Sequence, residues 1–138
     1  MKKLMQSYII DLKTITDSRG SLTAIEGALD IPFEIKRIFY MHHVSSDRGG
    51  HAHIDTDQVL IPINGSLRVT LFNGKEYEEY VMDDNTKGLY IPRLYFTNMY
   101  EFTHETVCLV LSSTHYDMGR SLRSMDAYMA YLKENNYI

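Results

Sequence analysis

The sequence predicts an all-β fold, a jelly-roll barrel of antiparallel strands with one α-helix at the C-terminal end. Short apolar and β-branched stretches are separated by turn residues along most of the chain, a pattern typical of small β-barrels and β-sandwiches. Asn-Gly pairs at 64–65 and 73–74 separate three of these stretches, which favours antiparallel hairpins over βαβ units. From residue 121 onward the apolar residues recur at helical spacing instead.

Each expected strand is a short apolar run that ends at Gly, Pro, Asn or Asp. Residues 17–22 form a turn in which Gly20 can take a positive φ, and residues 45–50 form a polar loop. The run 35–40 is apolar on both alternating faces, so we expect it to be sandwiched between layers or to lie at a subunit contact. The expected strands are 8–12, 22–26, 35–40, 58–63, 67–72, 75–82, 88–92 and 106–112.

The expected helix covers residues 121–135. Its apolar stripe contains Leu122, Met125 and Leu132 and predicts packing against the barrel. Ser121 is a candidate N-cap, and Lys133 near the other end complements the helix dipole.

Composition narrows the class of protein. A chain of 138 residues is long enough for one domain with a core, so we expect a single domain over residues 1–138. The net charge of −4 with scattered signs argues against nucleic acid as a partner. The one cysteine, Cys108, lies in an apolar run, which predicts a buried, unreactive thiol and fits a reducing compartment. No export signal or membrane-spanning run is visible, and we expect a cytoplasmic protein.

The stretch Arg48-Gly-Gly-His-Ala-His53 carries the clearest chemical signal. Side chains alternate along an extended backbone, so His51 and His53 should point to the same face. Imidazole is a usable acid and base near neutral pH. The pair therefore predicts a site where protons are moved, unless the two rings merely line a pocket or bond loop backbone.

A His-x-His strand in a small β-barrel also resembles the metal-binding cupins. In those sites a carboxylate and a later histidine complete the ligand set, but this chain has Gln58 at the first place and no histidine within residues 93–98. Two imidazoles alone do not make a closed divalent site. We therefore predict no metal and no other cofactor, with a metal-dependent cupin oxygenase kept as an alternative.

Several strings occur in one order along the chain. They are Asp17-Ser-Arg-Gly-Ser-Leu22, Ile31-Pro-Phe-Glu-Ile-Lys-Arg-Ile-Phe-Tyr40, the His51 and His53 string, Ile63-Asn-Gly-Ser-Leu67, Gly88-Leu-Tyr-Ile-Pro92, Tyr116-Asp117 and Leu122-Arg123. The set closely resembles the dTDP-sugar 3,4-ketoisomerases, cupin enzymes on routes to 3-amino-3,6-dideoxyhexoses such as Fuc3N and Qui3N. The resemblance implies dTDP-4-keto-6-deoxyglucose as substrate, a 3-keto product, no metal, and a homodimer that exchanges N-terminal strands.

The resemblance also implies roles for individual residues. His51 and His53 would be catalytic, Tyr40 would face the same sugar, and Arg19 and Arg48 would contact the ligand. Two places depart from the family pattern: Phe96-Thr97 stands where Trp-His is usual, and Arg120-Ser121 replaces an aspartate-aromatic pair. The first departure removes an indole and a histidine, so no role of theirs carries over to this chain.

The reaction of a 3,4-ketoisomerase can be carried out by two imidazoles and a phenol. The C3 proton is acidic because it is α to the C4 ketone, and an enediol links the two ketones. One base near neutral pKa can take that proton while a second group moves protons between the oxygens. We assign His51 as the base and His53 with Tyr40 as the shuttle, although the two histidines are interchangeable on sequence alone.

The nucleotide needs cations and a flat apolar contact. Guanidinium groups match phosphate oxygens, so Arg37 joins Arg19 and Arg48 as a candidate. Tyr90, Tyr95 and Phe96 are candidates for thymine, and Gln58 completes the expected substrate contacts. Two alternative functions stay open: a dTDP-sugar 3,5-epimerase-like cupin and a sugar-nucleotide binding module without activity.

Overall fold

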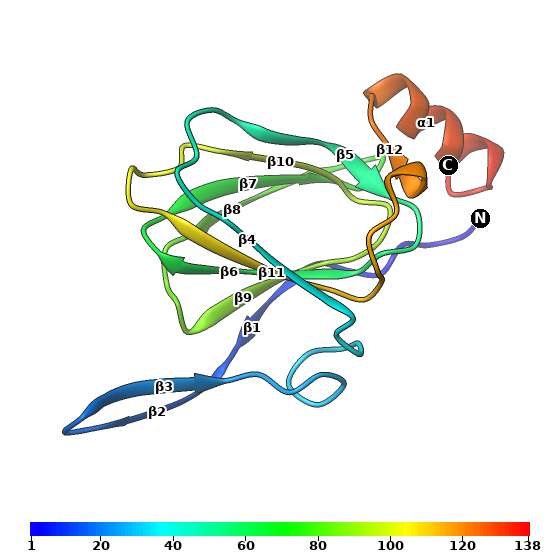
Figure 1. Ribbon diagram of the computed structural model, residues 1–138. Coiled ribbons are helices and arrows are strands. Elements are labelled where there is room, and N and C mark those ends of the chain that lie inside the picture. The colour runs from blue at the N-terminus through cyan, green and yellow to red at the C-terminus, as the bar shows by residue number, and fades with distance from the viewer.

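The computed structural model describes residues 1–138 except for the side chain of Met118. Almost all of the regular structure is strand, with one short 3₁₀ turn and one α-helix near the C-terminal end (Figure 1). The elements are β1 (Tyr8–Asp11), β2 (Lys13–Asp17), β3 (Gly20–Ala24), β4 (Arg37–Met41), β5 (Arg48–His53), β6 (Gln58–Asn64), β7 (Leu67–Phe72), β8 (Tyr77–Met82), β9 (Lys87–Ile91), β10 (Phe96–Tyr100), β11 (Val107–Ser112), η1 (Met118–Arg120), β12 (Ser121–Leu122) and α1 (Met125–Glu134).

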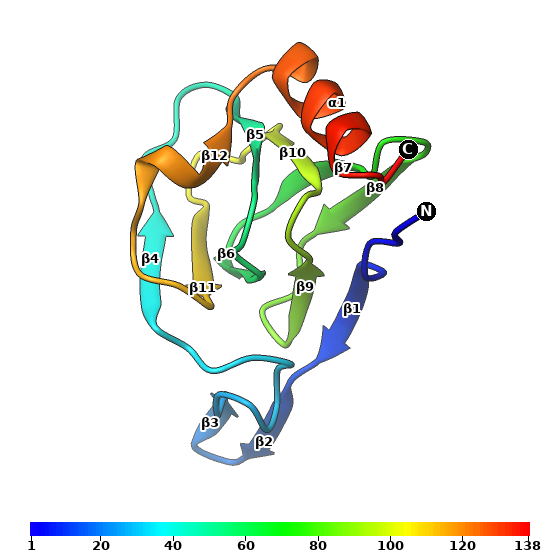
Figure 2. The ribbon, with the colours of Figure 1, turned by 90° about the vertical axis from the view of Figure 1, so that its right-hand side faces the viewer.

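Two five-stranded antiparallel sheets form the body. One has the order β1-β9-β6-β11-β4 and the other β12-β5-β10-β7-β8. The sheets pack face to face, and β2 and β3 form a separate two-stranded arm that projects away from them (Figures 1 and 2). The expected antiparallel jelly-roll class is confirmed. Among the described strands, no hydrogen-bonded strand pair joins the two five-stranded sheets.

The core lies between the sheets because inward-facing residues alternate along each strand. Leu67, Val69 and Leu71 of β7 are at most 1% exposed and pack with Leu60 and Val110 from the opposite sheet. Cys108 belongs to the same core and is fully buried. The expected burial of this thiol is confirmed, and burial raises its pKa to about 12, which disfavours the reactive thiolate.

Helix α1 covers the outer face of β5 and β10. Tyr128 and Leu132 are fully buried against Ala52 and Phe96, and the Tyr128 hydroxyl donates to the carbonyl of Leu94 at 2.7 Å. The expected helix exists, but its N-cap is Ser124. Ser121 instead lies in β12 and pairs with β5, so the N-cap assigned to it from sequence was wrong.

Two further expectations were wrong. Asn64-Gly65 does not close a hairpin, because β6 and β7 belong to different sheets; Gly65, at φ 71°, turns the chain from one sheet to the other. Only the second Asn-Gly pair lies between paired strands, β7 and β8. The strands β2, β10 and β12 were not expected, and β5 includes residues 48–50 of the expected polar loop. Among the described residues, no helix is both long enough and apolar enough to cross a bilayer.

Candidate active site

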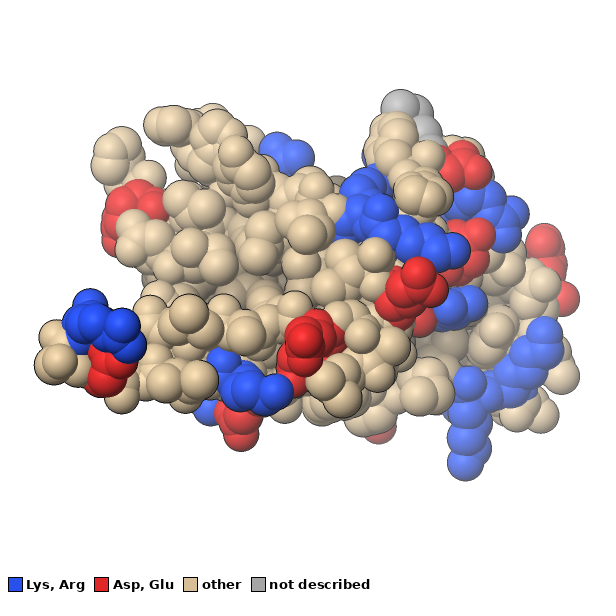
Figure 3. All heavy atoms as spheres, turned by 60° about the horizontal axis from the view of Figure 1, so that its bottom comes forward, with Lys and Arg blue, Asp and Glu red and all other residues tan. Residues whose placement is uncertain are grey.

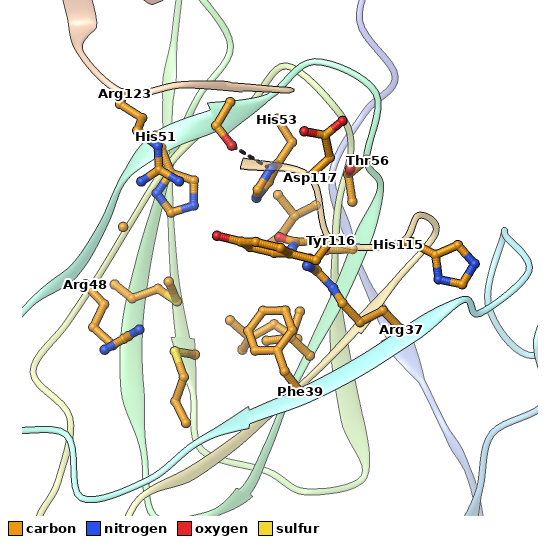
Figure 4. Close-up of a pocket in the computed structure, with 18 residues that line it drawn as sticks. Arg37, Phe39, Arg48, His51, His53, Thr56, His115, Tyr116, Asp117 and Arg123 are labelled. Atoms are coloured by element: carbon orange, nitrogen blue, oxygen red, sulfur yellow. Dashed lines mark hydrogen bonds between the residues drawn. The ribbon is translucent and has the colours of Figure 1, made fainter. Parts of the chain in front are cut away.

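A cavity of about 520 Å³ opens between the two sheets. Its inner wall is apolar, and its rim carries cationic, imidazole and hydroxyl groups (Figure 4). The volume is in the range of small-molecule sites. The residues that line it are Arg37, Phe39, Met41, Arg48, Gly49, His51, His53, Thr56, Gln58, Leu60, Ile91, Met99, Val110, His115, Tyr116, Asp117, Ser121 and Arg123.

His51 and His53 both face this cavity, as the alternation of β5 predicted. Their ring centroids are 5.0 Å apart and the rings meet edge to face at 80°. Ala52, between them, points the other way and is fully buried under α1. On the next strand, the Ser121 hydroxyl lies 3.4 Å from Nδ1 of His53. The tautomer with a proton on Nδ1 would leave Nε2 as a free base.

The surroundings keep both imidazoles neutral. Burial lowers the pKa of His53 to about 4, and His51, Arg37 and Arg123 add to this effect. Burial also lowers the pKa of His51, opposed by a hydrogen bond with the Gly49 backbone. A neutral imidazole can accept a proton, and the imidazolium that forms here is unstable and returns it readily.

Three arginines, Arg37, Arg48 and Arg123, line the cavity. None of them belongs to an ion pair among the described residues. The guanidinium of Arg37 lies between two rings, with Cζ 5.2 Å from the centroid of Phe39 and 5.3 Å from that of Tyr116. Its Nε is buried and has no hydrogen-bond partner. A buried donor of this kind favours an anionic or oxygen-rich ligand.

Five of the eight predicted site residues therefore meet in one cavity: His51, His53, Arg37, Arg48 and Gln58. Gln58 donates to the Ser112 hydroxyl at 3.4 Å, which orients its side chain.

Three predicted residues do not lie in this cavity. Tyr40 is 62% exposed, because the inward positions of β4 are taken by its neighbours Phe39 and Met41. Tyr90 points to the outer face of its sheet, where it is 4% exposed and lies 5.2 Å from the ring of Tyr8. Arg19 sits at the tip of the arm, paired with Asp17 at 2.6 Å. Within one chain, their assignment to the substrate site is therefore corrected.

Sequence reasoning gave no role to Phe39, Tyr116 or Arg123, all of which line the cavity. The strings Tyr116-Asp117 and Leu122-Arg123 were a usable signal for the last two. Phe96 and Thr97, which replace the usual Trp-His, do not line the cavity: Phe96 packs on Tyr128, and Thr97 bonds the Tyr95 carbonyl.

No group of three or more His, Cys, Asp or Glu residues in the described part of the chain is arranged to hold a metal ion. The donor set at the cavity consists of imidazole, guanidinium, hydroxyl and amide groups, with Asp117 as the one carboxylate. The Asp117 carboxylate accepts from the Gly119 amide at 3.0 Å. This set suits an anion better than a cation.

Fold and site together define a class: a small jelly-roll protein whose interior cavity combines cations for an anionic ligand with two neutral imidazoles for proton transfer. Residues 5–133 match the family described as FdtA, WxcM-like, C-terminal, and the chain belongs to this family.

Characterised relatives are similar over nearly the whole chain. A TDP-4-oxo-6-deoxy-α-D-glucose-3,4-oxoisomerase of Aneurinibacillus thermoaerophilus is 39% identical over 134 residues, 96% of each chain. The structure of QdtA, a sugar 3,4-ketoisomerase from Thermoanaerobacterium thermosaccharolyticum in complex with TDP, superposes with a TM-score of 0.89 at 40% identity, covering 94% of this chain and 96% of QdtA. A 3,4-ketoisomerase from Helicobacter canadensis gives 0.90 at 33% identity, covering 94% and 98%.

Proposed function

We propose that this protein is a 3,4-ketoisomerase that converts dTDP-4-keto-6-deoxyglucose into a dTDP-3-keto-6-deoxyhexose. The product would then be aminated at C3 to give a 3-amino-3,6-dideoxyhexose. The observation that carries the proposal is the pair of neutral, contacting imidazoles in a cavity rimmed by unpaired arginines. The relative of Aneurinibacillus thermoaerophilus, whose name states this activity, supports it.

The reaction needs one proton taken from C3 and one returned to C4. His51 is our candidate for the base, because its pKa is lowered and it is neutral at pH 7. His53, 5.0 Å away between ring centroids, is the candidate for assisting the phenol that moves protons between the oxygens. The apolar inner wall keeps bulk water away from the enediol, which limits side reactions of this intermediate.

The nucleotide needs partners for its phosphates. Arg48 and Arg37 are our candidates, since a guanidinium fork matches two phosphate oxygens, and the buried Nε of Arg37 has no partner among the described residues. Gln58 is our candidate for a hydroxyl or carbonyl of the sugar. We place the reaction in the cytoplasm, whose reducing conditions fit the free thiol of Cys108.

We also propose a homodimer built with the β2–β3 arm. The arm pairs only with itself, and an isolated two-stranded hairpin is marginally stable in water. Its cross-strand pair Ile15 and Leu22 is 62% and 60% exposed, and Ile38 and Tyr40 on β4 are 58% and 62% exposed. A broad uncharged area lies on the side from which the arm projects (Figure 3). A second copy would cover these surfaces.

Such a dimer would let Arg19 contact the ligand of the other copy. At the arm tip it is remote from the cavity of its own chain, but an exchanged arm would carry it toward the other copy. Sedimentation of Leu22→Asp tests the arrangement. We expect monomers from this variant and dimers from Val81→Asp, a control at an exposed position of β8 (52%). A wild-type chain that sediments as a monomer would refute the dimer.

Incubation with dTDP-4-keto-6-deoxyglucose, followed by NMR, tests the activity. We expect a 3-keto product, trapped as the 3-amino sugar when a PLP-dependent aminotransferase is present. Deuterium uptake at C5 in labelled water would instead indicate a 3,5-epimerase. Binding of the sugar nucleotide without any turnover would leave a binding module.

A further inference from the structure

The segment between β11 and β12 is fastened at both ends to the loop that follows the histidine strand. At the start, the backbone amide of Ser113 donates to the carbonyl of Asp57 at 3.0 Å. The Ser113 hydroxyl in turn accepts from the backbone amide of Asp57 at 2.8 Å. At the far end, Arg120 pairs with Asp55 at 3.0 Å, and its carbonyl accepts from the Ile54 amide at 3.0 Å. The middle of the segment, residues 115–117, is exposed and lies at the cavity rim.

Among the described residues that line the cavity, Tyr116 is the one tyrosine. Its ring lies against the guanidinium of Arg37 and is 65% exposed. In Figure 4 the ring spans the cavity between Phe39 and the imidazole pair, and its hydroxyl is directed toward the side of His51. A sugar seated against the imidazoles would therefore contact this ring and its hydroxyl.

We propose that Tyr116 is a catalytic residue that moves the proton between the two sugar oxygens; this rests on the proposed ketoisomerase activity. His51 takes the proton from C3, the C3–H electrons form the C3=C4 bond, and the phenol gives its proton to O4. The phenolate then takes the proton of O3 as the C3=O bond forms, and C4 receives the proton held by the imidazolium. Both residues end as they began, and the C3 and O3 protons have been replaced by protons on C4 and O4.

The guanidinium of Arg37 favours Tyr116 over other tyrosines for this role. A phenolate that forms during turnover would be stabilised by the Arg37 guanidinium, which is held against the ring. Tyr40, the phenol expected from sequence, has no such partner in the cavity because it lies on the outer face of β4.

The test compares Tyr116→Phe with Tyr77→Phe, a matched control at a tyrosine of β8 with 64% exposure. In D₂O we measure exchange at C3 of dTDP-4-keto-6-deoxyglucose and formation of the 3-keto product. We expect turnover of Tyr116→Phe to fall by roughly 10²-fold or more, as for loss of a general acid–base group, while C3 exchange persists because the imidazole base remains. Binding of dTDP, measured by calorimetry, should be unchanged, and Tyr77→Phe should match the wild type.

Equal losses of exchange and turnover in Tyr116→Phe would overturn the proposal, because a purely structural defect slows both. Wild-type turnover in this variant would overturn it as well, and so would the expected behaviour appearing in Tyr40→Phe instead. A wild-type protein that makes no 3-keto product would refute the ketoisomerase itself, a result distinct from these.

Discussion

His51 and His53 contact each other edge to face, with ring centroids 5.0 Å apart, inside the cavity between the two sheets. One residue of extended backbone separates them, and that residue, Ala52, is locked under the helix. The strand therefore fixes both the spacing and the direction of the two imidazoles. The packing of Ala52 against Tyr128 and Leu132 thus restrains the strand that carries both rings.

Replacing either histidine by asparagine should remove most of the activity. Asparagine keeps a polar side chain of similar size but cannot carry a proton between substrate atoms. We expect turnover to fall by about 10²–10⁴-fold in His51→Asn and in His53→Asn, with dTDP binding retained. Steady-state kinetics and calorimetry check this. An exposed control, His104→Asn, should behave as the wild type; a histidine variant that retains full turnover would remove that ring from the mechanism.

Stability should depend on pH through the same pair. The pKa of His53 is lowered from 6.5 to about 4 in the folded state, so between these values the unfolded chain binds a proton that the folded chain does not. Stability is therefore fully present above pH 6.5 and is lost as pH falls toward 4, by about 3 kcal/mol at most from this residue. Urea unfolding at several pH values measures the loss, which should shrink in His53→Asn.

The pH dependence of activity should follow from the neutral bases. Because burial lowers the pKa of both histidines, the base form persists below the usual range of histidine. We expect kcat/KM to stay level on acidification through pH 6.5 and to decline only at lower pH. A decline centred at pH 6.5 would contradict the lowered pKa values.

Nucleotide binding should depend on Arg48. Arg48→Met keeps the apolar stem but removes the charge, and we expect the Kd for dTDP to rise by about tenfold or more, as for loss of a hydrogen bond to a charged group. Arg68→Met is the matched control, since Arg68 pairs with Glu79 and Glu101 away from the cavity. Calorimetry at two salt concentrations should also show weaker wild-type binding at the higher one. An unchanged Kd in Arg48→Met would exclude Arg48 as a phosphate contact.

Gly49, beside Arg48, is required by the backbone. It has φ 99°, and an added Cβ would lie 2.5 Å from the carbonyl oxygen of Thr97. Gly49→Ala should therefore cost strain and a steric clash. Gly20→Ala, at φ 129° with nothing within 4 Å, should cost only the strain, about 1–3 kcal/mol. Thermal unfolding should rank Gly49→Ala as the less stable variant. Equal unfolding temperatures for the two variants would mean that the neighbouring strand β10 shifts to accommodate the added Cβ.

Local patterns predicted the fold class and the histidine face well. The alternation of a strand is a local property, so His51 and His53 could be assigned to one face from sequence. The same rule could not decide which face of β4 is inward, because Phe39 and Tyr40 are both aromatic. The family resemblance gave Tyr40 the role of a cavity residue, while its neighbour Phe39 lines the cavity.

Local sequence patterns could not predict which distant segments of the chain lie next to each other. Asn64-Gly65 has the composition of a hairpin turn, yet it joins strands of different sheets, since turn chemistry says nothing about which strands pair. Tyr90 looked like a ligand contact but is buried under the N-terminal segment with Leu12 and Phe33. Tyr116 and Arg123 reach the cavity only because β12 pairs with β5, a contact between distant parts of the chain.

The most direct test of the account follows deuterium placed at C3 of dTDP-4-keto-6-deoxyglucose. With the wild-type protein we predict that the label leaves C3 and is found in part at C4 of the 3-keto product, because the imidazolium that takes it from C3 returns it to C4, and that His51→Asn leaves the label at C3 under the same conditions. If the wild type retained the label at C3, or if the wild type and His51→Asn lost it at the same rate, proton removal by the imidazole pair would be contradicted.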